Sequence, residues 1–314
     1  MPLVLGTTNG VWALNGRPEQ IGLANRKTVH VADQDGTILA AVPKDGLYTT
    51  GADTDQRIWE GDARASAVGP DGSFYVGTEP AMVFRSDDRG ASWTRCSRID
   101  QLPTRSKWYF PPPPHEPHVR SIDFLPDDTR SVLVGIEVGG VLLSRDRGES
   151  WAEMNEGVYV DVHQVRPDRL AAGRLIAATG NGLYLSEDHA ASWQRITVGG
   201  GESYAVGVGF NPQRAGEVLI ATGDRPPGLN ARVFHSLDGG RSWTQIAHST
   251  LPNKYARVPV LLFAGGSAWI MTDDGQVFRS DDARGSWSLV AELGTPIHAA
   301  SAGGSPSSVN YGFA

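Results

Sequence analysis

Short apolar runs, each bounded by turn-forming residues, recur along the whole chain. They come in pairs, such as Ala63–Val68 followed by Ser73–Gly77, with Gly, Asp and Pro between them. Short runs rich in β-branched residues predict strands, and the residues between them predict hairpin turns. The pattern therefore predicts an all-β chain.

The paired runs mark a repeating unit. Five pairs precede a shared motif: Ala63–Val68 with Ser73–Gly77, Val119–Phe124 with Val132–Gly135, Val160–Val165 with Leu175–Thr179, Tyr204–Phe210 with Val218–Thr222, and Val258–Phe263 with Ala268–Thr272. A sixth unit lacks the motif and contains four predicted strands: Val29–Ala32, Thr37–Val42, Leu47–Thr50 and Arg57–Glu60.

The shared motif is Ser-x-Asp-x-Gly-x-Ser-Trp. Its aspartates are separated by 58, 42, 50 and 44 residues and are Asp88, Asp146, Asp188, Asp238 and Asp282. Two copies are degraded, because Ala190 and Arg284 stand where glycine is expected. Repeats of this length suit one four-stranded propeller blade each.

These segments resemble the Asp-box (BNR) repeats of sialidases, xyloglucanases, sortilin-type receptors and photosystem assembly factors. The resemblance implies a β-propeller whose motif turns lie on the outer rim and serve the structure. In such a turn the aspartate accepts backbone N–H bonds, glycine supplies a positive φ, and tryptophan is buried between blades. The resemblance does not fix an activity, because these relatives include enzymes, receptors and assembly factors.

The two chain ends complete a further blade. Pro296–Ala300 has the pattern of an innermost strand, while Leu3–Thr7 and Gly10–Asn15 have the pattern of the next two. Joining the ends removes exposed sheet edges, which otherwise invite aggregation. We therefore predict one domain over residues 1–314, an all-β, seven-bladed β-propeller closed by pairing N- and C-terminal strands in one blade.

Composition narrows the class of partner. The net charge of -7 argues against general affinity for nucleic acid or acidic membranes. No apolar run approaches the roughly 18 residues that cross a bilayer, and the first residues have the pattern of a strand and not of a signal peptide. Cys96 is the only cysteine, so no internal disulfide can form. We expect a cytoplasmic protein.

One connection is too long and too aromatic for an ordinary link between blades. It runs over residues 105–118 and contains Trp108, four consecutive prolines and His118. We expect it to form an arm folded across the pore, with packing on the rim as the alternative. A second insertion, Gly223–Asn230, contains Asp224 and is expected on the same face.

Titratable and other polar residues gather at one predicted mouth of the pore. In a propeller, the innermost strands begin on the face where the second strands end. The strand beginnings supply His30, Arg64, Arg120, His163, Tyr204, Arg257 and His298, and the strand ends supply Glu79, Glu137, Asn181, Asp224 and Asp273. Such a concentration at one concave end is typical of a binding or active site. The alternative is that Arg–Glu pairs only join neighbouring blades.

These residues predict an enzyme, hydrolase-like or lyase-like, that binds a small anionic or sugar-like substrate. Arg64, Arg120 and Arg257 would bind a carboxylate. Acid–base work would fall to Glu79 or Glu137, assisted by His163, Tyr204 or His298. Further substrate contacts are expected from His30, His118, Trp108 and Asp224.

The three arginines and Tyr204 resemble the site of true sialidases, but the chain shows no Arg-Ile-Pro motif near its start, so sialidase activity is not expected. The alternative to an enzyme is a non-catalytic scaffold that binds a protein partner, as photosystem assembly factors do. No cofactor is expected. The alternative is a metal held by His115 and His118 with His163 or His298.

Overall fold

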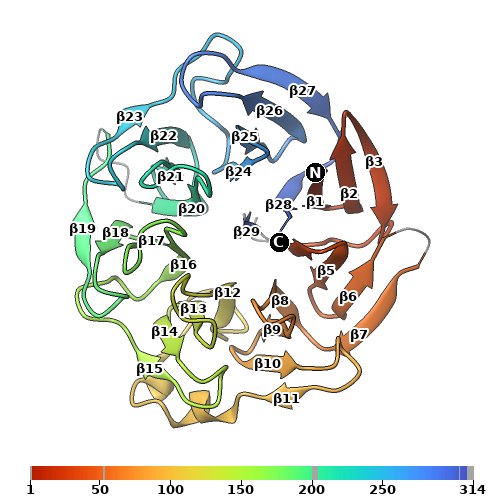
Figure 1. Cartoon of the computed structure of the whole chain (residues 1–314), viewed down its shortest axis with the longest axis vertical. Helices are drawn as coiled ribbons and strands as arrows, with labels where there is room; N and C mark the ends of the chain where they lie inside the picture. The colour runs from red at the N-terminus through yellow and green to blue at the C-terminus, as the bar shows by residue number, and fades with distance from the viewer. Residues whose placement is uncertain (1, 52–53, 200–203, 304, 310–314) are drawn as a thin grey trace.

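The computed structural model describes residues 2–51, 54–199, 204–303 and 305–309, and these form a ring of sheets around a central channel (Figure 1). There are seven sheets, six with four strands and one with five. The predicted seven-bladed β-propeller is confirmed.

Each blade is a sheet whose first strand lines the channel, and we number the blades along the chain. Blade 1 has strand order β29 (Ser305–Val309), β28 (Ile297–Ala302), β1 (Leu3–Thr7), β2 (Gly10–Asn15), β3 (Arg17–Gly22). Blade 2 contains β4 (His30–Gln34), β5 (Thr37–Val42), β6 (Gly46–Thr50), β7 (Gln56–Glu60). Blade 3 contains β8 (Ala63–Val68), β9 (Phe74–Thr78), β10 (Val83–Ser86), β11 (Thr94–Arg95).

The remaining blades repeat this plan. Blade 4 contains β12 (His118–Asp123), β13 (Val132–Glu137), β14 (Gly140–Ser144), β15 (Ala152–Glu153). Blade 5 contains β16 (Val162–Pro167), β17 (Leu175–Thr179), β18 (Gly182–Ser186), β19 (Gln194–Ile196). Blade 6 contains β20 (Tyr204–Phe210), β21 (Val218–Gly223), β22 (Arg232–Ser236), β23 (Thr244–Gln245). Blade 7 contains β24 (Val260–Ala264), β25 (Ser267–Met271), β26 (Gln276–Ser280), β27 (Ser288–Glu292).

Only short helices interrupt this β structure in the described residues. The 3₁₀ helices η1 (Ser97–Gln101) and η2 (Arg105–Lys107) lie between blades 3 and 4. Neither has the length or the apolar character needed to cross a membrane.

Blade 1 joins the two ends of the chain, as predicted. β1 pairs antiparallel with β28, and Leu5 lies opposite Ala300. One expectation was wrong, because β28 is not the innermost strand. The backbone turns back after Gly303, which has a positive φ of 49°, and β29 pairs with the channel side of β28. β29 approaches β4, β12, β20 and β24, so it lies inside the channel (Figure 1).

Four of the five motif turns are held by one bonding pattern, shown here for Asp146, while in the turn at Asp282 the carboxylate accepts the N–H groups of Arg284 and Gly285. Its Oδ1 accepts the hydroxyl of Ser144 at 2.8 Å and the backbone N–H of Ser150 at 2.8 Å. Ser144 Oγ in turn accepts the N–H of Gly148, whose φ is +94°. The motif carboxylates therefore accept hydrogen bonds from within their own turns, which supports a structural role for them.

The cores lie between blades, since both faces of each sheet are covered. One cluster combines Tyr75 and Val83 of blade 3 with Val119 and Val134 of blade 4. The motif tryptophans extend these cores outward: Trp193 of blade 5 is 5% exposed and donates its Nε1–H to the carbonyl of Met154 in blade 4 at 2.9 Å.

Candidate functional site

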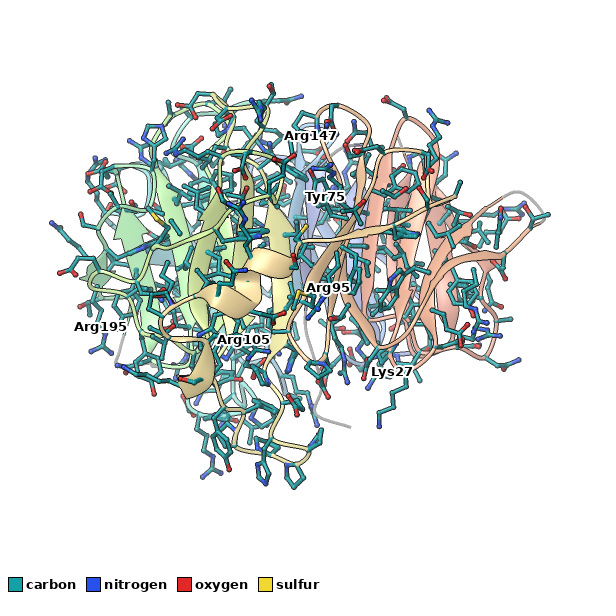
Figure 2. The ribbon with its side chains drawn as sticks, turned by 90° about the horizontal axis from the view of Figure 1, so that it is seen from below. Lys27, Tyr75, Arg95, Arg105, Arg147 and Arg195 are labelled. Carbon is teal, nitrogen blue, oxygen red and sulfur yellow. The ribbon has the colours of Figure 1, made fainter. Side chains whose placement is uncertain are left out.

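The ring has two faces, and the predicted site residues lie toward one of them. Seen edge-on in Figure 2, Arg147 of the second motif turn lies on one face and Lys27 on the opposite face. Lys27 belongs to the face where the innermost strands begin, because it lies in the short segment that leads into β4. The predicted site residues lie toward this second face.

A β-bulge recurs close to the first residue of five strands at or beside the channel, namely the innermost strands of blades 3 to 6 and β28 of blade 1. One residue of each is skipped in the pairing with the next strand outward: Arg64, Arg120, His163, Val206 and His298. A bulge leaves its extra residue unpaired and changes the direction of its side chain. Four of the five bulged residues are ones that the sequence selected as site candidates.

A small residue lies next to each bulge. On the neighbouring outer strand the partners there are Gly77, Gly135, Ala178, Ala221 and Gly6. A Cβ atom on Gly77 would lie 2.4 Å from Cγ1 of Val119, and one on Gly135 would lie 3.0 Å from Cγ1 of Val162. The missing side chains therefore let the next blade pack closely beside the bulge.

A pocket of about 360 Å³ opens on this face beneath the 105–118 connection. Phe110 and the prolines of that connection form one wall, and strands of blades 2 to 4 form the others. Its described lining is Lys27, Val29, Val42, Pro43, Lys44, Arg64, Glu79, Phe110, Pro112, Pro113, Pro114, His118 and Arg120. We call it the arm pocket.

Arg64 is held at the arm pocket by two carboxylates. Its Nε lies 2.7 Å from Oδ1 of Asp62 and its Nη2 lies 3.0 Å from Oδ2, a bidentate pair. Nη2 is also 3.1 Å from Oε2 of Glu79. These charges are mostly but not fully buried, with side-chain exposures between 10% and 17%. The pairing fixes the direction of the guanidinium group.

His118 stands between two carboxylates. Its Nδ1 lies 3.3 Å from Oε2 of Glu79, and its Nε2 lies 3.1 Å from Oε2 of Glu137. Phe110 of the arm packs edge-on against the imidazole, with ring centres 5.1 Å apart. The ring is thereby fixed from three sides at the pocket wall.

Glu137 ends β13 and is almost completely buried. Burial alone would raise the pKa of this carboxyl, but Arg120, at 2.6 Å, and His118 hold the pKa well below its usual range. Glu137 is therefore ionised at every physiological pH. It balances the charge of Arg120 and does not itself line the arm pocket.

His163 and Tyr204 lie behind Glu137 and also do not line the pocket. Their rings are 4.6 Å apart between centres. Burial raises the pKa of Tyr204, and the carboxylates of Glu137 and Asp161 raise it further against the effect of Arg120. The phenol therefore stays protonated, which does not suit a nucleophile.

Five other candidates lie outside the lining. His30 contacts Ser66 inside the ring, and His298 lies 2.9 Å from the hydroxyl of Thr8. Arg257 pairs with Asp273 at 3.7 Å. Trp108 is 8% exposed and packs into the core between blades 3 and 4, while Asp224 is exposed and bonds to Asn230 within its own loop.

Several residues at this mouth were not predicted from the sequence. Asp62 and Asp161 each stand two places before a bulged residue, as His118 stands before Arg120. Aligning the blades on the small second-strand residue would have revealed this polar-x-polar pattern. Lys44 lies on a turn and Lys27 in the irregular segment before β4, and neither carries a comparable signal.

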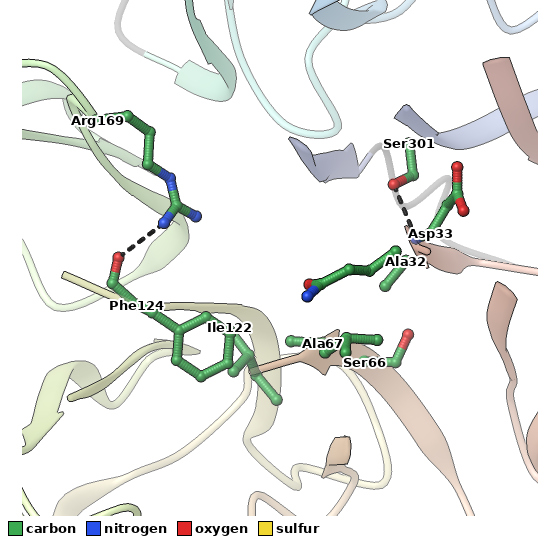
Figure 3. Close-up of a pocket in the computed structure, with 10 residues that line it drawn as sticks. Ala32, Asp33, Ser66, Ala67, Ile122, Phe124, Arg169 and Ser301 are labelled. Atoms are coloured by element: carbon green, nitrogen blue, oxygen red, sulfur yellow. Dashed lines mark hydrogen bonds between the residues drawn. The ribbon is translucent and has the colours of Figure 1, made fainter. Parts of the chain in front are cut away.

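Figure 3 shows a second pocket, toward the opposite mouth, where Arg169 donates to the carbonyl of Phe124 and Ser301 accepts the N–H of Asp33. Its volume is about 30 Å³, which is the volume of about one water molecule. It is too small for a substrate and is lined by none of the predicted site residues, several of which line the arm pocket.

Fold and pocket together define a seven-bladed β-propeller with an ion-paired pocket at one mouth. No protein-family model matches the chain. In sequence it is 24% identical over 231 residues to a probable oligoxyloglucan-reducing end-specific xyloglucanase of Neosartorya fischeri, a match that covers 65% of this chain and 26% of that protein.

Among solved structures, the GH74 xyloglucanase of Xanthomonas campestris superimposes with a TM-score of 0.72 at 17% identity, over 92% of this chain and 52% of the enzyme. YCF48 bound to a D1 peptide superimposes with a TM-score of 0.55 at 16% identity, over 84% of this chain and 81% of YCF48. At these identities the likeness shows the fold. The chain spans about half of the Xanthomonas enzyme and about a quarter of the curated relative.

Proposed function

We propose that the chain is a hydrolase-like or lyase-like enzyme that binds a small anionic or sugar-like substrate in the arm pocket. The observation that carries this proposal is the charge of the lining. The described lining contains four basic side chains, Lys27, Lys44, Arg64 and Arg120, against the carboxylate of Glu79 and those of Asp62 and Glu137, which pair with the two arginines, so positive charge is in excess by one. Basic groups around a partly enclosed site attract and orient a carboxylate-bearing ligand.

The state of Lys27 supports an anion site. Burial, followed by the charges of Arg64 and Arg257, lowers the pKa of its ammonium group. The basic groups at this mouth are thus close enough to repel one another, and an anion among them would relieve that repulsion. The likeness to xyloglucanases supports a sugar-like ligand.

The proposed role of each residue follows from its position at or behind the arm pocket. Arg64 would bind the substrate carboxylate. Glu79 and His118, which line the pocket side by side, would transfer protons. Glu137, ionised and buried, would act as a positioning residue by holding His118 and Arg120.

The test compares charged and neutral sugars on matched variants. Calorimetry of the full chain with glucuronate and galacturonate, and with glucose and galactose as neutral counterparts, should show binding of the uronates only. Arg64→Met should weaken uronate binding at least tenfold. Arg95→Met removes an exposed arginine on the outer strand of blade 3, outside the pocket lining, and should leave binding within about twofold.

Turnover is tested separately on uronic acid glycosides. Glu79→Gln should still bind uronate but lose activity, because it cannot exchange a proton. Uronate that fails to bind, or that binds Arg64→Met as well as the wild type, would refute the proposal.

A second candidate is a propeller that binds a peptide or protein and does no chemistry. The observation that favours it is the similarity to YCF48, whose solved structure holds a D1 peptide. The same basic pocket would then accept an acidic side chain or a terminal carboxylate. Tight binding of an acidic peptide, with no turnover of any glycoside, would favour this candidate over the enzyme.

We also propose that the protein works in the cytoplasm. Cys96 is buried as a free thiol. A chain whose stability uses no disulfide suits a reducing compartment, and fractionation of cells expressing the tagged chain tests this.

A further inference from the structure

Behind the arm pocket, three side chains bring ligand atoms to a common point. Glu137, Asp161 and His163 each offer one such atom, and these atoms lie within 4.8 Å of one another. Glu137 ends the second strand of blade 4, whereas Asp161 and His163 stand at the start of blade 5. Two neighbouring blades therefore meet at this point.

One ring nitrogen of His163 is held by the backbone. Its Nδ1 lies 2.6 Å from the carbonyl oxygen of Ala205. A carbonyl oxygen only accepts, so Nδ1 carries a proton and Nε2 is the ring nitrogen left to face Asp161. A backbone carbonyl that holds one ring nitrogen is a common way in which proteins orient a metal-binding histidine.

The atoms that face each other lack partners. Nε2 of His163 and Oδ1 of Asp161 are 3.6 Å apart, and within the described residues both are buried without a hydrogen bond. The His163 side chain is fully buried. A lone pair on Nε2 facing a buried carboxylate oxygen is unfavourable, and a cation at this point, either a metal ion or a proton on Nε2, satisfies both atoms.

We propose that Glu137, Asp161 and His163 bind one divalent transition-metal ion. Metal–ligand distances of about 2.0 to 2.2 Å leave room for an ion between donors 3.6 Å apart. One imidazole and two carboxylates suit Zn²⁺ or Mn²⁺ better than a soft ion that prefers thiolates. This set differs from the one expected from sequence, since it contains neither His115, His118 nor His298.

The glycine after β17 supports the placement of Asp161. Gly180 donates its N–H to the Asp161 carbonyl at 2.9 Å, and a Cβ atom on Gly180 would lie 2.1 Å from Oδ2 of Asp161. The close approach holds the carboxylate near His163. Gly180→Ala therefore offers a variant that displaces Asp161 while all three ligands remain.

The test is metal binding by the full chain, made without a histidine tag and stripped with chelator. Titration with Zn²⁺ and, separately, Mn²⁺ in a calorimeter should show about one ion per chain for at least one metal. His163→Gln and Asp161→Asn should each weaken that binding at least tenfold, and Gly180→Ala should weaken it too.

The matched control variants change the same types of residue at other positions of this mouth. His298→Gln changes another bulged histidine, and Asp273→Asn changes another carboxylate, so both should keep wild-type binding. Circular dichroism checks that every variant is folded. If neither metal binds at one ion per chain, if the ligand variants bind as well as the wild type, or if the controls lose binding equally, the inference is wrong.

This inference does not rest on the proposed function, because metal is measured without substrate. Uronate binding without metal binding would refute only the metal site, and metal binding without uronate binding would refute only the proposed substrate.

Discussion

His30 is a buried neutral histidine, and its replacement has an effect on stability that can be calculated. Its Nδ1 accepts the backbone N–H of Ser66 at 3.3 Å, and its side chain is almost fully buried inside the ring. Burial, and then the charge of Arg166, lowers its pKa to about 3. His30→Asn keeps an acceptor near the position of Nδ1 but cannot be protonated.

The sign and size of the effect on the free energy of unfolding follow from the difference in proton binding between the folded and unfolded chains. Between pH 6.5 and 3 the unfolded chain binds a proton at His30 and the folded chain does not, so the free energy of unfolding falls as the pH falls. With the lowered pKa of about 3, lowering the pH from 7.5 to 5 costs the wild type about 2 kcal/mol at this residue. His30→Asn should not show this loss.

Urea unfolding followed by tryptophan fluorescence at pH 7.5, 6 and 5 measures the difference. The motif aspartates do not interfere, since hydrogen bonds from Ser92 and Ser86 keep the pKa of Asp88 at about 2. His115→Asn, at an exposed histidine, should keep the wild-type slope because His30 is intact. Parallel pH profiles for the wild type and His30→Asn would refute the assignment of His30 as buried and neutral.

Three further predictions concern the ring. Gly135→Ala should lower the free energy of unfolding by about 1–3 kcal/mol in urea, because the new Cβ would lie 2.7 Å from Ser121 Oγ and 3.0 Å from Val162. Trp193→Ala should cost about 3–5 kcal/mol in the same assay, since this ring fills the gap between two blades. Deleting residues 1–15 removes β1 and β2 and should abolish cooperative melting in calorimetry.

For each of these three predictions, one outcome would contradict the stated reason. Gly209→Ala is the control for the bulge, because its Cβ would make only an ordinary contact of 3.4 Å with the Leu261 carbonyl; equal losses for both variants would remove the special role of Gly135. A loss near 1 kcal/mol for Trp193→Ala would mean that the turn, and not the ring, joins the blades. Unchanged melting after the deletion would mean that blade 1 is not needed to close the propeller.

Much of the fold could be predicted because its strands carry apolar residues on both faces. Tyr204–Phe210 matches β20 residue for residue, whereas the predicted Val160–Val165 began two residues before β16. Hydrophobic pattern does not show where a hydrogen-bonded ladder begins. β29 was missed because residues 305–309 are mostly serine and proline, and its pairing rests on the backbone of β28.

The candidate site was harder to predict, because depth along a strand is invisible in sequence. Propeller topology was enough to place Arg64, Glu79 and Arg120 at one mouth, where ion pairs and the pocket now join them. Their functional roles stay predictions. His30 and Trp108 were predicted at the same mouth, but the His30 side chain contacts Ser66 inside the ring and the Trp108 side chain packs into the core. Sequence alone cannot distinguish these directions.

The repeated bulge has a consequence for how this protein can change. A bulged residue has no partner in the ladder, so replacing it does not disturb the pairing that builds the blade. Arg64, His163, Val206 and His298 already show how different these side chains can be on one backbone plan. The ring thus separates the residues that pair in its ladders from the bulged residues at this mouth. Single substitutions at the bulges can therefore change the chemistry of the mouth one blade at a time.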